Sequence, residues 1–344
     1  MSPFEKFAEH ALVSAVIPTR RRPDLLVCAI RSALRQTWRP LEVIVVFDGP
    51  DAATEERLAA LADPRLRIVI LPEISGGCAA RNAGVRAAAG EWIAFLDDDD
   101  EWLPNKIERQ MRATREISTW FPVITCRLIA RSPTASRVLP ARVYHPGQAV
   151  ADYLFCRSGV ADSGGLMQSS TLLAPRDLLL AVPFRDGLPM HQDWDWIIRV
   201  ASYEGVTISM LAKPLAIWRV EDRRATVGRG TGWQFSLSWI REMRSLISRR
   251  AFSSFIAIQC VWRAKASHAG PMARLRILWA FLFEGRPDPL SSLHFLVFSL
   301  LPAAFRRAVR DAFRLLRDRD DSSSGLCLAS ARKPASAPLR KTSH

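Results

Sequence analysis

Short apolar runs alternate with helical patterns through the first hundred residues of the chain. Four runs have the length and composition of buried strands, at residues 12–17, 41–47, 66–71 and 92–96. Between them the pattern predicts helices at 23–34, 52–61 and 78–89. Farther along, residues 167–173 are predicted to form another short strand. Pro23 suits a first helical turn, and Gly90 suits the end of the third helix. This alternation predicts an α/β fold with a mainly parallel sheet flanked by helices.

Polar or glycine-rich residues follow each predicted strand. They are Pro18 and Thr19, Asp48-Gly49, Ser75-Gly76-Gly77 and Asp97 to Asp100. In an open parallel sheet, ligands bind beyond the carboxyl ends of the strands. Turn residues follow every strand, but four such ends in succession indicate a nucleotide-type ligand. The first strand is not followed by G-x-G-x-x-G, which argues against an NAD-dependent enzyme.

The run Asp97 to Asp100 places four adjacent carboxylates at the end of a buried strand. Their repulsion needs a cation to offset it. Mg²⁺ suits this position, because it usually takes one or two carboxylates and leaves its other positions to phosphate and water. The alternative is an acidic turn that caps a helix beginning near Pro104. These residues alone leave both interpretations open.

The composition adds a strong positive charge to this picture. The chain has 344 residues and a net charge of +14, which suggests nucleic acid, a membrane surface or an anionic substrate as a partner. From residue 301 onward there are ten Lys and Arg against four Asp. The six cysteines form no CxxC pair, and residues 1–10 lack a leader pattern, so we expect reduced thiols in a cytoplasmic protein.

The segments VSAVIPTRRRPDLL, LEVIVVFDGPD and GGCAARNAGVRAAAGEWIAFLDDDDEW resemble the N-terminal half of a family 2 glycosyltransferase with the Rossmann-like GT-A fold. The resemblance is dense over residues 13–110, is limited to motifs over 165–220, and does not reach the C-terminal third. It implies a metal-dependent (Mg²⁺ or Mn²⁺), inverting transfer of sugar from a nucleotide-sugar, with a UDP-sugar as the expected donor. The acceptor would be a hydroxyl of a glycan or lipid-linked molecule in the synthesis of cell-surface polysaccharide.

The resemblance also implies roles for individual residues. Pro18, Thr19 and Asp48 would line the nucleoside pocket, and Asp48 would accept a hydrogen bond from the base. Arg81 and Asn82 match the family's ARN segment near the donor. The family usually has two acids before the glycine here, whereas this chain has Phe47 and Asp48.

The acidic run matches the DxD region of the same family. The resemblance places Asp97 and Asp98 at the donor, with Asp98 near the ribose, and Asp99 on the metal ion. Farther along, WRVE at 218–221 resembles the family's Y-R-V-H ending, whose His often helps to hold metal or diphosphate. Glu221 stands in the position of this His. It is either a metal ligand or the partner of a nearby arginine in a surface salt bridge.

The segment QDWDWIIR at 192–199 is similar to the family's ED-Y/W-D-x-W-x-R motif, whose second acid is the general base. A sugar hydroxyl is a weak nucleophile, so a positioned carboxylate is needed to take its proton. Gln192 replaces the first acid, and Asp193 is therefore the predicted base. From the sequence alone, Asp193 is equally a helix cap. Asp195 is expected to be a structural partner of Arg199 at i+4.

We expect a catalytic domain over 1–228, with a nucleotide-sugar half at about 11–110 and an acceptor half at about 111–228. A basic, membrane-associated helical region at 229–320 and a disordered tail at 321–344 would follow. The apolar run 289–305 is too short to span a membrane and contains Pro302. Residues 293–316 are therefore predicted to lie on an anionic membrane surface, at the inner face of the cell membrane. The alternative is a helical hairpin packed on the catalytic domain.

Two other functions compete with this hypothesis. A nucleic-acid-binding protein would explain the charge, but the arginines cluster in the tail and no nucleic-acid motif is present, so no nucleic-acid partner is expected. A nucleotidyltransferase of similar fold would be expected to have a glycine-rich phosphate loop after the first strand, and PTR at 18–20 is not one.

Overall fold

A computed structural model of the chain describes residues 10–159, 162, 164–220 and 232–301. Contacts divide the chain into one unit of residues 1–300 and a second of 301–344, and only the first residue of the second unit is described. Glu221, the predicted domain boundary at 228 and the predicted tail at 321–344 lie outside the described residues, as does the part of the predicted membrane segment beyond 301.

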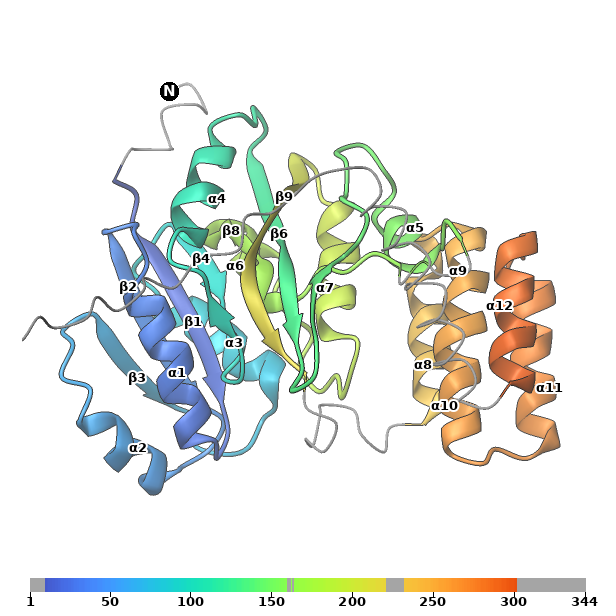
Figure 1. Cartoon of the computed structure of the whole chain (residues 1–344), viewed down its shortest axis with the longest axis horizontal. Coiled ribbons are helices and arrows are strands. Elements are labelled where there is room, and N and C mark those ends of the chain that lie inside the picture. The colour runs from blue at the N-terminus through green and yellow to red at the C-terminus, as the bar shows by residue number, and fades with distance from the viewer. Residues whose placement is uncertain (1–9, 160–161, 163, 221–231, 302–344) are drawn as a thin grey trace, which may run out of the picture. The chain divides into compact units, whose positions relative to one another are not determined.

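One nine-stranded sheet organises the N-terminal unit (Figure 1). Its first half is parallel and has the order β3-β2-β1-β4. These strands are β1 (Val13–Thr19), β2 (Leu41–Phe47), β3 (Leu66–Ile70) and β4 (Trp92–Phe95). Thr19 lies opposite Phe47, and Val16 lies opposite Phe95. Asp48 and Asp97 therefore leave the sheet near each other at its carboxyl edge.

Alternate residues of β1 point into two different cores. Val13, Ala15 and Ile17 pack with α1 (Pro23–Leu34), whereas Val16 packs on the other face with α3 (Gly77–Ala87). A Cβ atom on Gly84 of α3 would lie 2.3 Å from Val16 Cγ1, so this close packing requires glycine. The predicted α/β class, with helices on both faces of the sheet, is confirmed.

The edge strand β3 differs from its neighbours. Ile68 and Ile70 are each 42% exposed, and among the described residues only β2 pairs with this strand. A shorter helix, α2 (Ala52–Ala59), precedes the strand, and Asp51 caps it by accepting from the Thr54 amide. The predicted strand at 66–71 is present, but it is not buried as its apolar sequence suggested.

The second half of the sheet is mixed. Strand β8 is antiparallel to β4 and to β6, while the long strands β6 and β9 run parallel to each other. The remaining strands are β5 (Glu101–Trp102), β6 (Phe121–Arg131), β7 (Ser136–Leu139), β8 (Leu173–Pro175) and β9 (Val206–Arg219). The helices here are α4 (Lys106–Thr114), α5 (Val150–Phe155), α6 (Arg176–Ala181) and α7 (Gln192–Ala201). The sheet is thus parallel where the sequence predicted it and antiparallel in part beyond β4.

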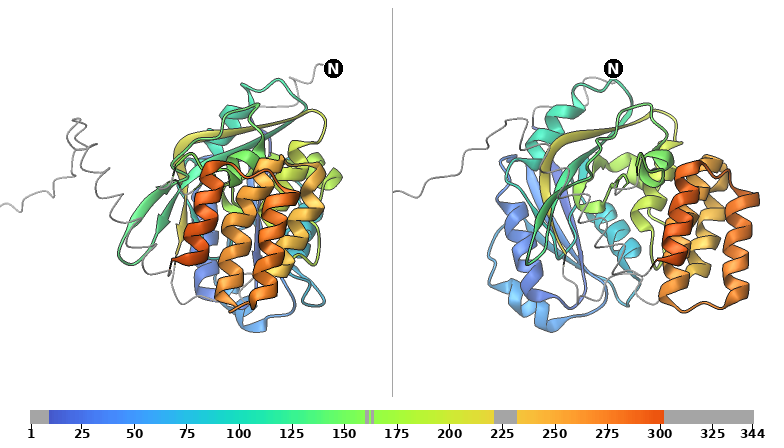
Figure 2. Two further views of the ribbon diagram at one scale, coloured as in Figure 1. Left: turned by 90° about the vertical axis from the view of Figure 1, so that its right-hand side faces the viewer. Right: turned by 45° about the vertical axis from the view of Figure 1, so that its right-hand side comes forward.

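The predicted helical C-terminal extension is also confirmed, and its helices lie side by side in Figure 2. They are α8 (Trp233–Glu242), α9 (Arg249–Phe255), α10 (Val261–Ala266), α11 (Pro271–Trp279) and α12 (Pro289–Leu300). Two π-helical turns, Ile256–Cys260 and Ala280–Glu284, continue α9 and α11. None of the helices in the described part of the chain is long and apolar enough to cross a membrane.

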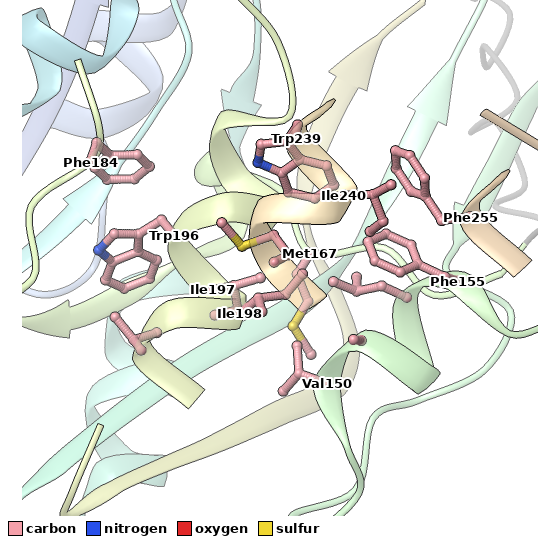
Figure 3. Close-up of a cluster of buried hydrophobic side chains, with 14 of the residues drawn as sticks. Val150, Phe155, Met167, Phe184, Trp196, Ile197, Ile198, Trp239, Ile240 and Phe255 are labelled. Carbon is pink, nitrogen blue, oxygen red and sulfur yellow. The ribbon is translucent and has the colours of Figure 1, made fainter. Parts of the chain in front are cut away.

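Aromatic side chains join these helices to the sheet-bearing half. Trp196 of α7, Trp239 of α8 and Phe255 of α9 belong to one buried cluster (Figure 3). Phe155 of α5 contacts Phe255 edge to face, with ring centroids 5.1 Å apart. Helices α8 and α9 therefore complete a core that begins in the sheet-bearing half.

Candidate functional site

A cavity of about 540 Å³ opens at the carboxyl ends of β1, β2 and β4. This volume lies within the range that small-molecule ligands occupy, roughly 300–1,000 Å³. Its walls come from all four strand ends that the sequence singled out and from three later segments. The lining residues are Pro18, Thr19, Arg20, Arg22, Asp48, Gly76, Gly77, Ala80, Arg81, Asp97, Asp98, Asp99, Gln168, Leu188, Pro189, Gln192 and Trp218.

Asp48 fixes one wall of the cavity. Its Oδ1 accepts hydrogen bonds from the backbone N–H groups of Ser75, at 2.6 Å, and Gly76, at 2.9 Å. The turns beside it need positive φ angles, +92° at Gly49 and +90° at Gly76, which glycine adopts without strain. This carboxylate therefore holds the start of α3 against the end of β2.

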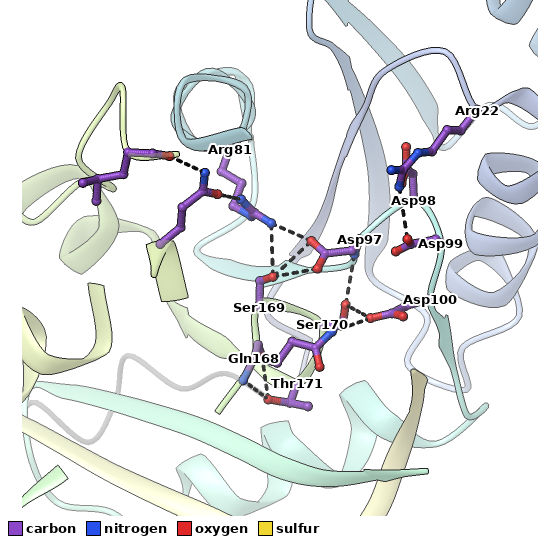
Figure 4. Close-up of polar contacts among 12 residues, drawn as sticks. Arg22, Arg81, Asp97, Asp98, Asp99, Asp100, Gln168, Ser169, Ser170 and Thr171 are labelled. Atoms are coloured by element: carbon purple, nitrogen blue, oxygen red, sulfur yellow. Dashed lines mark hydrogen bonds and ion pairs between the residues drawn. The ribbon is translucent and has the colours of Figure 1, made fainter. Parts of the chain in front are cut away.

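Arg22 bridges two of the four consecutive acids. Its Nη1 lies 3.2 Å from Asp98 Oδ1 and 3.1 Å from Asp99 Oδ2 (Figure 4). Thr19 Oγ1 donates to the other oxygen of Asp98 at 2.8 Å. Burial raises the pKa of Asp98 to about 6, although Arg22 and Thr19 oppose the shift. The need for a positive charge at this strand end, inferred from the sequence, is thus met in part by Arg22.

Asp97 faces a different cation. It accepts from Arg81 Nη2 at 2.6 Å and from Ser169 Oγ at 3.0 Å (Figure 4). Arg81 Nη1 also donates to Gln192 Oε1 at 2.9 Å. Burial opposes the charge of Arg81, but the carboxylates of Asp97 and Asp193 outweigh it and raise the pKa of the guanidinium. Arg81 thus links β4 to the N-terminus of α7 across one end of the cavity.

Asp100 does not line the cavity. Its carboxylate accepts from Ser170 Oγ at 2.6 Å and from Gln168 Nε2 at 2.8 Å, and burial raises its pKa well above the usual range. These bonds clamp a 3₁₀ turn at Ser169–Thr171, where the sequence predicted a strand over 167–173. The strand prediction is wrong except at Leu173, where β8 begins. The backbone forms a turn here, and the side-chain hydroxyls of Ser169 and Ser170 bind Asp97 and Asp100.

The helix-capping interpretation of the four acids is also wrong. Helix α4 begins only at Lys106, its N-cap is Asn105, and no side chain caps it. The short strand β5 separates the acids from this helix. Three of the acids line the cavity, and the fourth supports the turn beneath it.

Helix α7 carries the predicted general base. Its N-cap is His191, with φ of 63°, and Asp193 makes no side-chain cap, so the capping interpretation of Asp193 fails. Oδ1 of Asp193 is enclosed and has no hydrogen-bond partner among the described residues. Burial raises the pKa of Asp193 to about 6, with Arg81 opposing and Asp97 adding to the shift. Gln192 lines the cavity, but Asp193 beside it does not.

Asp195 anchors the same helix. It is fully buried and accepts from Arg199 Nε at 2.8 Å, from Trp239 Nε1 at 3.0 Å and from Arg185. The predicted i+4 partnership with Arg199 is confirmed. The bonds from Trp239 and Arg185 fix the rotation of α7, and with it the position of Asp193.

Seven of the residues predicted for donor and metal binding line this one cavity. They are Pro18, Thr19, Asp48, Arg81, Asp97, Asp98 and Asp99. Asn82 lies elsewhere: its side-chain amide donates to Phe184 O at 2.8 Å and to Asp186 Oδ1 at 3.0 Å. It therefore holds the loop before α7.

The sequence did not single out Arg22, Gln168, Ser169 or Ser170 as site residues. Arg22 stood within a run of three arginines, and nothing in the run separates it from Arg20 and Arg21. The polar triplet Gln168, Ser169 and Ser170 was a possible signal, because three polar residues are unusual inside a buried strand.

The donor atoms at the cavity suit a hard divalent cation. Asp98 and Asp99 present carboxylate oxygens near a common point, which Arg22 now contacts. Burial raises the pKa of Asp98 although Arg22 lies beside it, so a further positive charge at this point would favour the ionised carboxylate. Among the described residues, no three acidic, His or Cys side chains form a ready-made metal cluster. An ion held by one or two of these carboxylates would complete its shell with phosphate and water.

Comparison with known proteins adds independent information. Residues 14–130 match the model of "Glycosyl transferase family 2". The chain is 25% identical over 286 residues to the amylovoran biosynthesis glycosyltransferase AmsB of Erwinia amylovora, covering 80% of this chain and 92% of AmsB. It is 33% identical over 100 residues to WfgD of Escherichia coli, a UDP-Glc:alpha-D-GlcNAc-diphosphoundecaprenol beta-1,3-glucosyltransferase, covering 29% of this chain and 40% of WfgD.

Among solved structures, the chain resembles the mannosyltransferase PcManGT of Pyrobaculum calidifontis, solved with GDP-Man and Mn²⁺. The TM-score is 0.48 at 17% identity, over 94% of this chain and 85% of that one. The family match covers β1 to β4, with the strand ends that build most of the cavity, and the likeness to AmsB extends through most of the chain. These comparisons identify this protein as a glycosyltransferase whose residues 14–130 are similar to glycosyl transferase family 2.

Proposed function

We propose that this enzyme transfers a sugar, with inversion, from a nucleotide-sugar to a hydroxyl of a glycan or lipid-linked acceptor during surface polysaccharide synthesis. One observation carries the proposal: a single cavity brings together Asp48, Arg81 and the three carboxylates Asp97 to Asp99. The names of two relatives support the pathway and the acceptor. AmsB is named for amylovoran biosynthesis, and WfgD for a UDP-glucose donor and a diphosphoundecaprenol acceptor.

Donor binding is assigned to the wall formed by β1 and β2. Pro18 and Thr19 would contact the nucleoside, and Asp48 would accept from the base with Oδ2, since its backbone hydrogen bonds fall on Oδ1. Asp98 would bind the ribose once Arg22 has moved from it. A UDP-sugar is the first donor to test.

Asp99 is the residue that would hold Mg²⁺ or Mn²⁺. When bound, such an ion supplies positive charge that stabilises the departing diphosphate. Arg22 now contacts Asp99, so it must release this carboxylate before an ion binds there. Glu221 stays a proposed second ligand, outside the described residues. Arg81, already ion-paired to Asp97, would keep that carboxylate fixed beside the donor.

Asp193 is the proposed general base. It would take the proton of the acceptor hydroxyl as the oxygen attacks the anomeric carbon, from the face opposite the diphosphate. A pKa near 6 suits this task, because the carboxylate is ionised at neutral pH yet is more basic than an exposed aspartate. The free Oδ1 supplies an unused acceptor, and the bonds to Asp195 hold the helix that carries it.

The test separates binding from chemistry. Asp193→Asn is expected to bind UDP with Mn²⁺ as the wild type does and to lose transfer by about a hundredfold or more. Asp97→Asn serves as a comparison, because Asp97 lines the cavity and is the alternative base. Near-normal transfer by Asp193→Asn, together with loss in Asp97→Asn, would reassign the base. Hydrolysis of UDP-, GDP- and dTDP-sugars would identify the donor.

Location at the inner face of the cell membrane is part of the same proposal, since nucleotide-sugars are cytoplasmic and lipid-linked acceptors lie at that surface. The predicted membrane segment began at Leu293. Its described part, α12, exposes Leu293, Leu296 and Leu300 at a spacing of three and four residues. These exposed side chains support a peripheral attachment through the helical region.

A further inference from the structure

Helix α11 and the π-turn after it present large apolar side chains to solvent. Met272, Leu275, Trp279 and Phe283 are 66%, 58%, 60% and 59% exposed, and Leu278 and Leu282 lie beside them. The spacing from Met272 through Leu275 and Trp279 to Phe283 is three, four and four residues, so the four share one face of the helix. We call these six residues the α11 face.

The opposite side of the same helix is already buried. Ile277, Ala280 and Phe281 are at most 3% exposed and belong to the core shared with α8 and α9. The α11 face is therefore not needed to hold the helix in place. Large contiguous apolar patches on a protein surface mark sites that contact another protein or a membrane.

The helical region that carries the α11 face has more basic than acidic side chains. The described helical residues 232–301 contain nine Lys and Arg against three acids. Each of those acids is already ion-paired: Glu242 with Arg185, Glu284 with Arg241, and Asp288 with Arg250.

Three exposed arginines lie close in sequence to the residues of the α11 face: Arg274 and Arg276 within α11, and Arg286 just after the π-turn. Their side chains make no ion pair with any residue in the described ranges, since the acids nearest in sequence are taken. Arg274 and Arg276 directly flank Leu275. An apolar stripe bordered by free guanidinium groups is complementary to a surface that is apolar inside and anionic at its rim.

Helix α12 packs against the buried side of α11, where Phe281 stacks on Phe295 of α12 with ring centroids 4.5 Å apart. Helix α12 adds exposed Leu293, Leu296 and Leu300. Both helices lie on the side of the helical region away from the sheet (Figures 1 and 2). The chain that follows α12 is rich in arginine.

We propose that the α11 face enters the interface of an anionic lipid membrane, while Arg274, Arg276 and Arg286 bind lipid phosphates. The inference rests on the proposed function only for the reason to bind a membrane, namely a lipid-linked acceptor. Trp279 suits this depth, because tryptophan favours the boundary between headgroups and acyl chains. The attachment is interfacial, as none of the helices in the described ranges reaches spanning length.

A second copy of the chain is the main competing occupant. It would bring the same three arginines against each other, and the described acids of the region are already paired, so the contact would be repulsive at low salt. An anionic bilayer meets the apolar and the basic groups at once. Charge complementarity therefore favours the membrane.

The experiment is flotation of the full-length protein with vesicles of phosphatidylglycerol and phosphatidylcholine, and with phosphatidylcholine alone. The wild type is expected to float with the anionic vesicles, less so at high salt. Arg274→Gln/Arg276→Gln/Arg286→Gln should weaken partition by roughly a hundredfold, since each basic group contributes about a fivefold gain. Leu275→Ser/Trp279→Ser should weaken it at every salt concentration.

Matched controls lie on the sheet-bearing half. Trp120→Ser changes another exposed tryptophan, and Arg31→Gln/Arg35→Gln/Arg39→Gln removes three exposed arginines on and just after α1. Both controls are expected to float like the wild type. UDP binding, measured on every variant, reports whether the fold is intact.

The outcomes separate this inference from the proposed function. A wild type that transfers sugar but ignores anionic vesicles overturns the membrane face and leaves the activity standing. Equal flotation of the wild type and the α11-face variants also overturns it. A protein that dimerises through Leu275 and Trp279, detected by light scattering, would assign the face to a second copy instead.

Discussion

Arg22 holds two cavity carboxylates, Asp98 and Asp99, with one guanidinium nitrogen. At the scale of single residues, this contact explains how four adjacent acids are tolerated before any ligand arrives. The carboxylates are stabilised by two guanidinium groups, of Arg22 and Arg81, and by hydrogen bonds from the hydroxyls of Thr19, Ser169 and Ser170. The resemblance indicated the acids, whereas their partners come from segments up to 79 residues away, which no local pattern reveals.

The contact also predicts competition between Arg22 and a divalent ion. Arg22→Ala should bind Mn²⁺ more tightly than the wild type in the absence of donor, by about fivefold, because a partly exposed ion pair is removed. Calorimetric titration with MnCl₂ measures the change. Arg20→Ala is the matched control, since Arg20 lines the same cavity and makes no ion pair with the residues described. Weaker Mn²⁺ binding by Arg22→Ala would contradict the competition.

The buried Asp98 carboxyl predicts a dependence of stability on pH. Burial raises its pKa in the folded protein to about 6, against about 3.9 in an unfolded chain, so the folded state binds the proton more strongly. Its contribution to the free energy of unfolding is therefore favourable below pH 4 and is lost as pH rises from about 4 to about 6. Thermal melts of the donor-free protein should show this loss.

Asp98→Asn should melt higher than the wild type at pH 7, and the difference should shrink toward pH 4. Asp24→Asn is the control, because its side chain is exposed. A difference between Asp98→Asn and wild type that does not change with pH would contradict the assignment. The same melts with UDP should show that Asp98→Asn gains stability at the expense of donor affinity.

The individual elements differ in how well the sequence predicted them. Strand β2 and helix α1 begin and end where the apolar pattern placed them, because each buries a continuous local stripe. The long strands β6 and β9 were not recognised. They pair with each other across more than 80 residues, for example Phe121 with Val206, and their sequences mix apolar and polar side chains. The 3₁₀ turn at Ser169–Thr171 depends on Asp97 and Asp100, which follow β4, so the local pattern alone predicted a strand there.

The hydrogen bonds to Asp195 hold helix α7, which carries Asp193, in place. Asp195→Ala should lower the free energy of unfolding by about 3 kcal/mol, because it leaves Trp239, Arg185 and Arg199 without their shared acceptor. Urea denaturation measures the change. Glu242→Ala removes a different, exposed partner of Arg185 and should cost less than about 1 kcal/mol. Equal effects of the two variants would contradict the role of Asp195 as an anchor.

The whole molecule joins two regions that the sequence treated separately. The resemblance ended near residue 220, and the aromatic residues of the next helices looked like part of a membrane-associated segment. In the structure, Trp239 and Phe255 instead pack on α5 and α7, while the exposed apolar surface lies farther along, on α11. Pattern alone could not separate these two uses of apolar side chains, since both show helical spacing.

This shared core predicts that the sheet-bearing half is not independent. A chain that ends at residue 220 loses Trp239 and Phe255, which pack on Phe155, and it should fail to show a cooperative thermal transition. A chain that ends at residue 301 retains α8 to α12 and should melt within a few degrees of the full-length protein. A cooperative transition in the shorter chain would show that the predicted catalytic domain folds without the helices.

We propose that the cavity at the carboxyl ends of β1, β2 and β4 binds a nucleotide-sugar through a divalent ion at Asp99. Calorimetric titration of UDP into the wild type and Asp99→Ala, each with and without Mn²⁺, tests it most directly. Binding of UDP by the wild type is expected to strengthen about tenfold or more with Mn²⁺, whereas Asp99→Ala should show no Mn²⁺ effect. Binding of a single-stranded oligonucleotide but not of UDP, or an equal Mn²⁺ effect in both proteins, would contradict it.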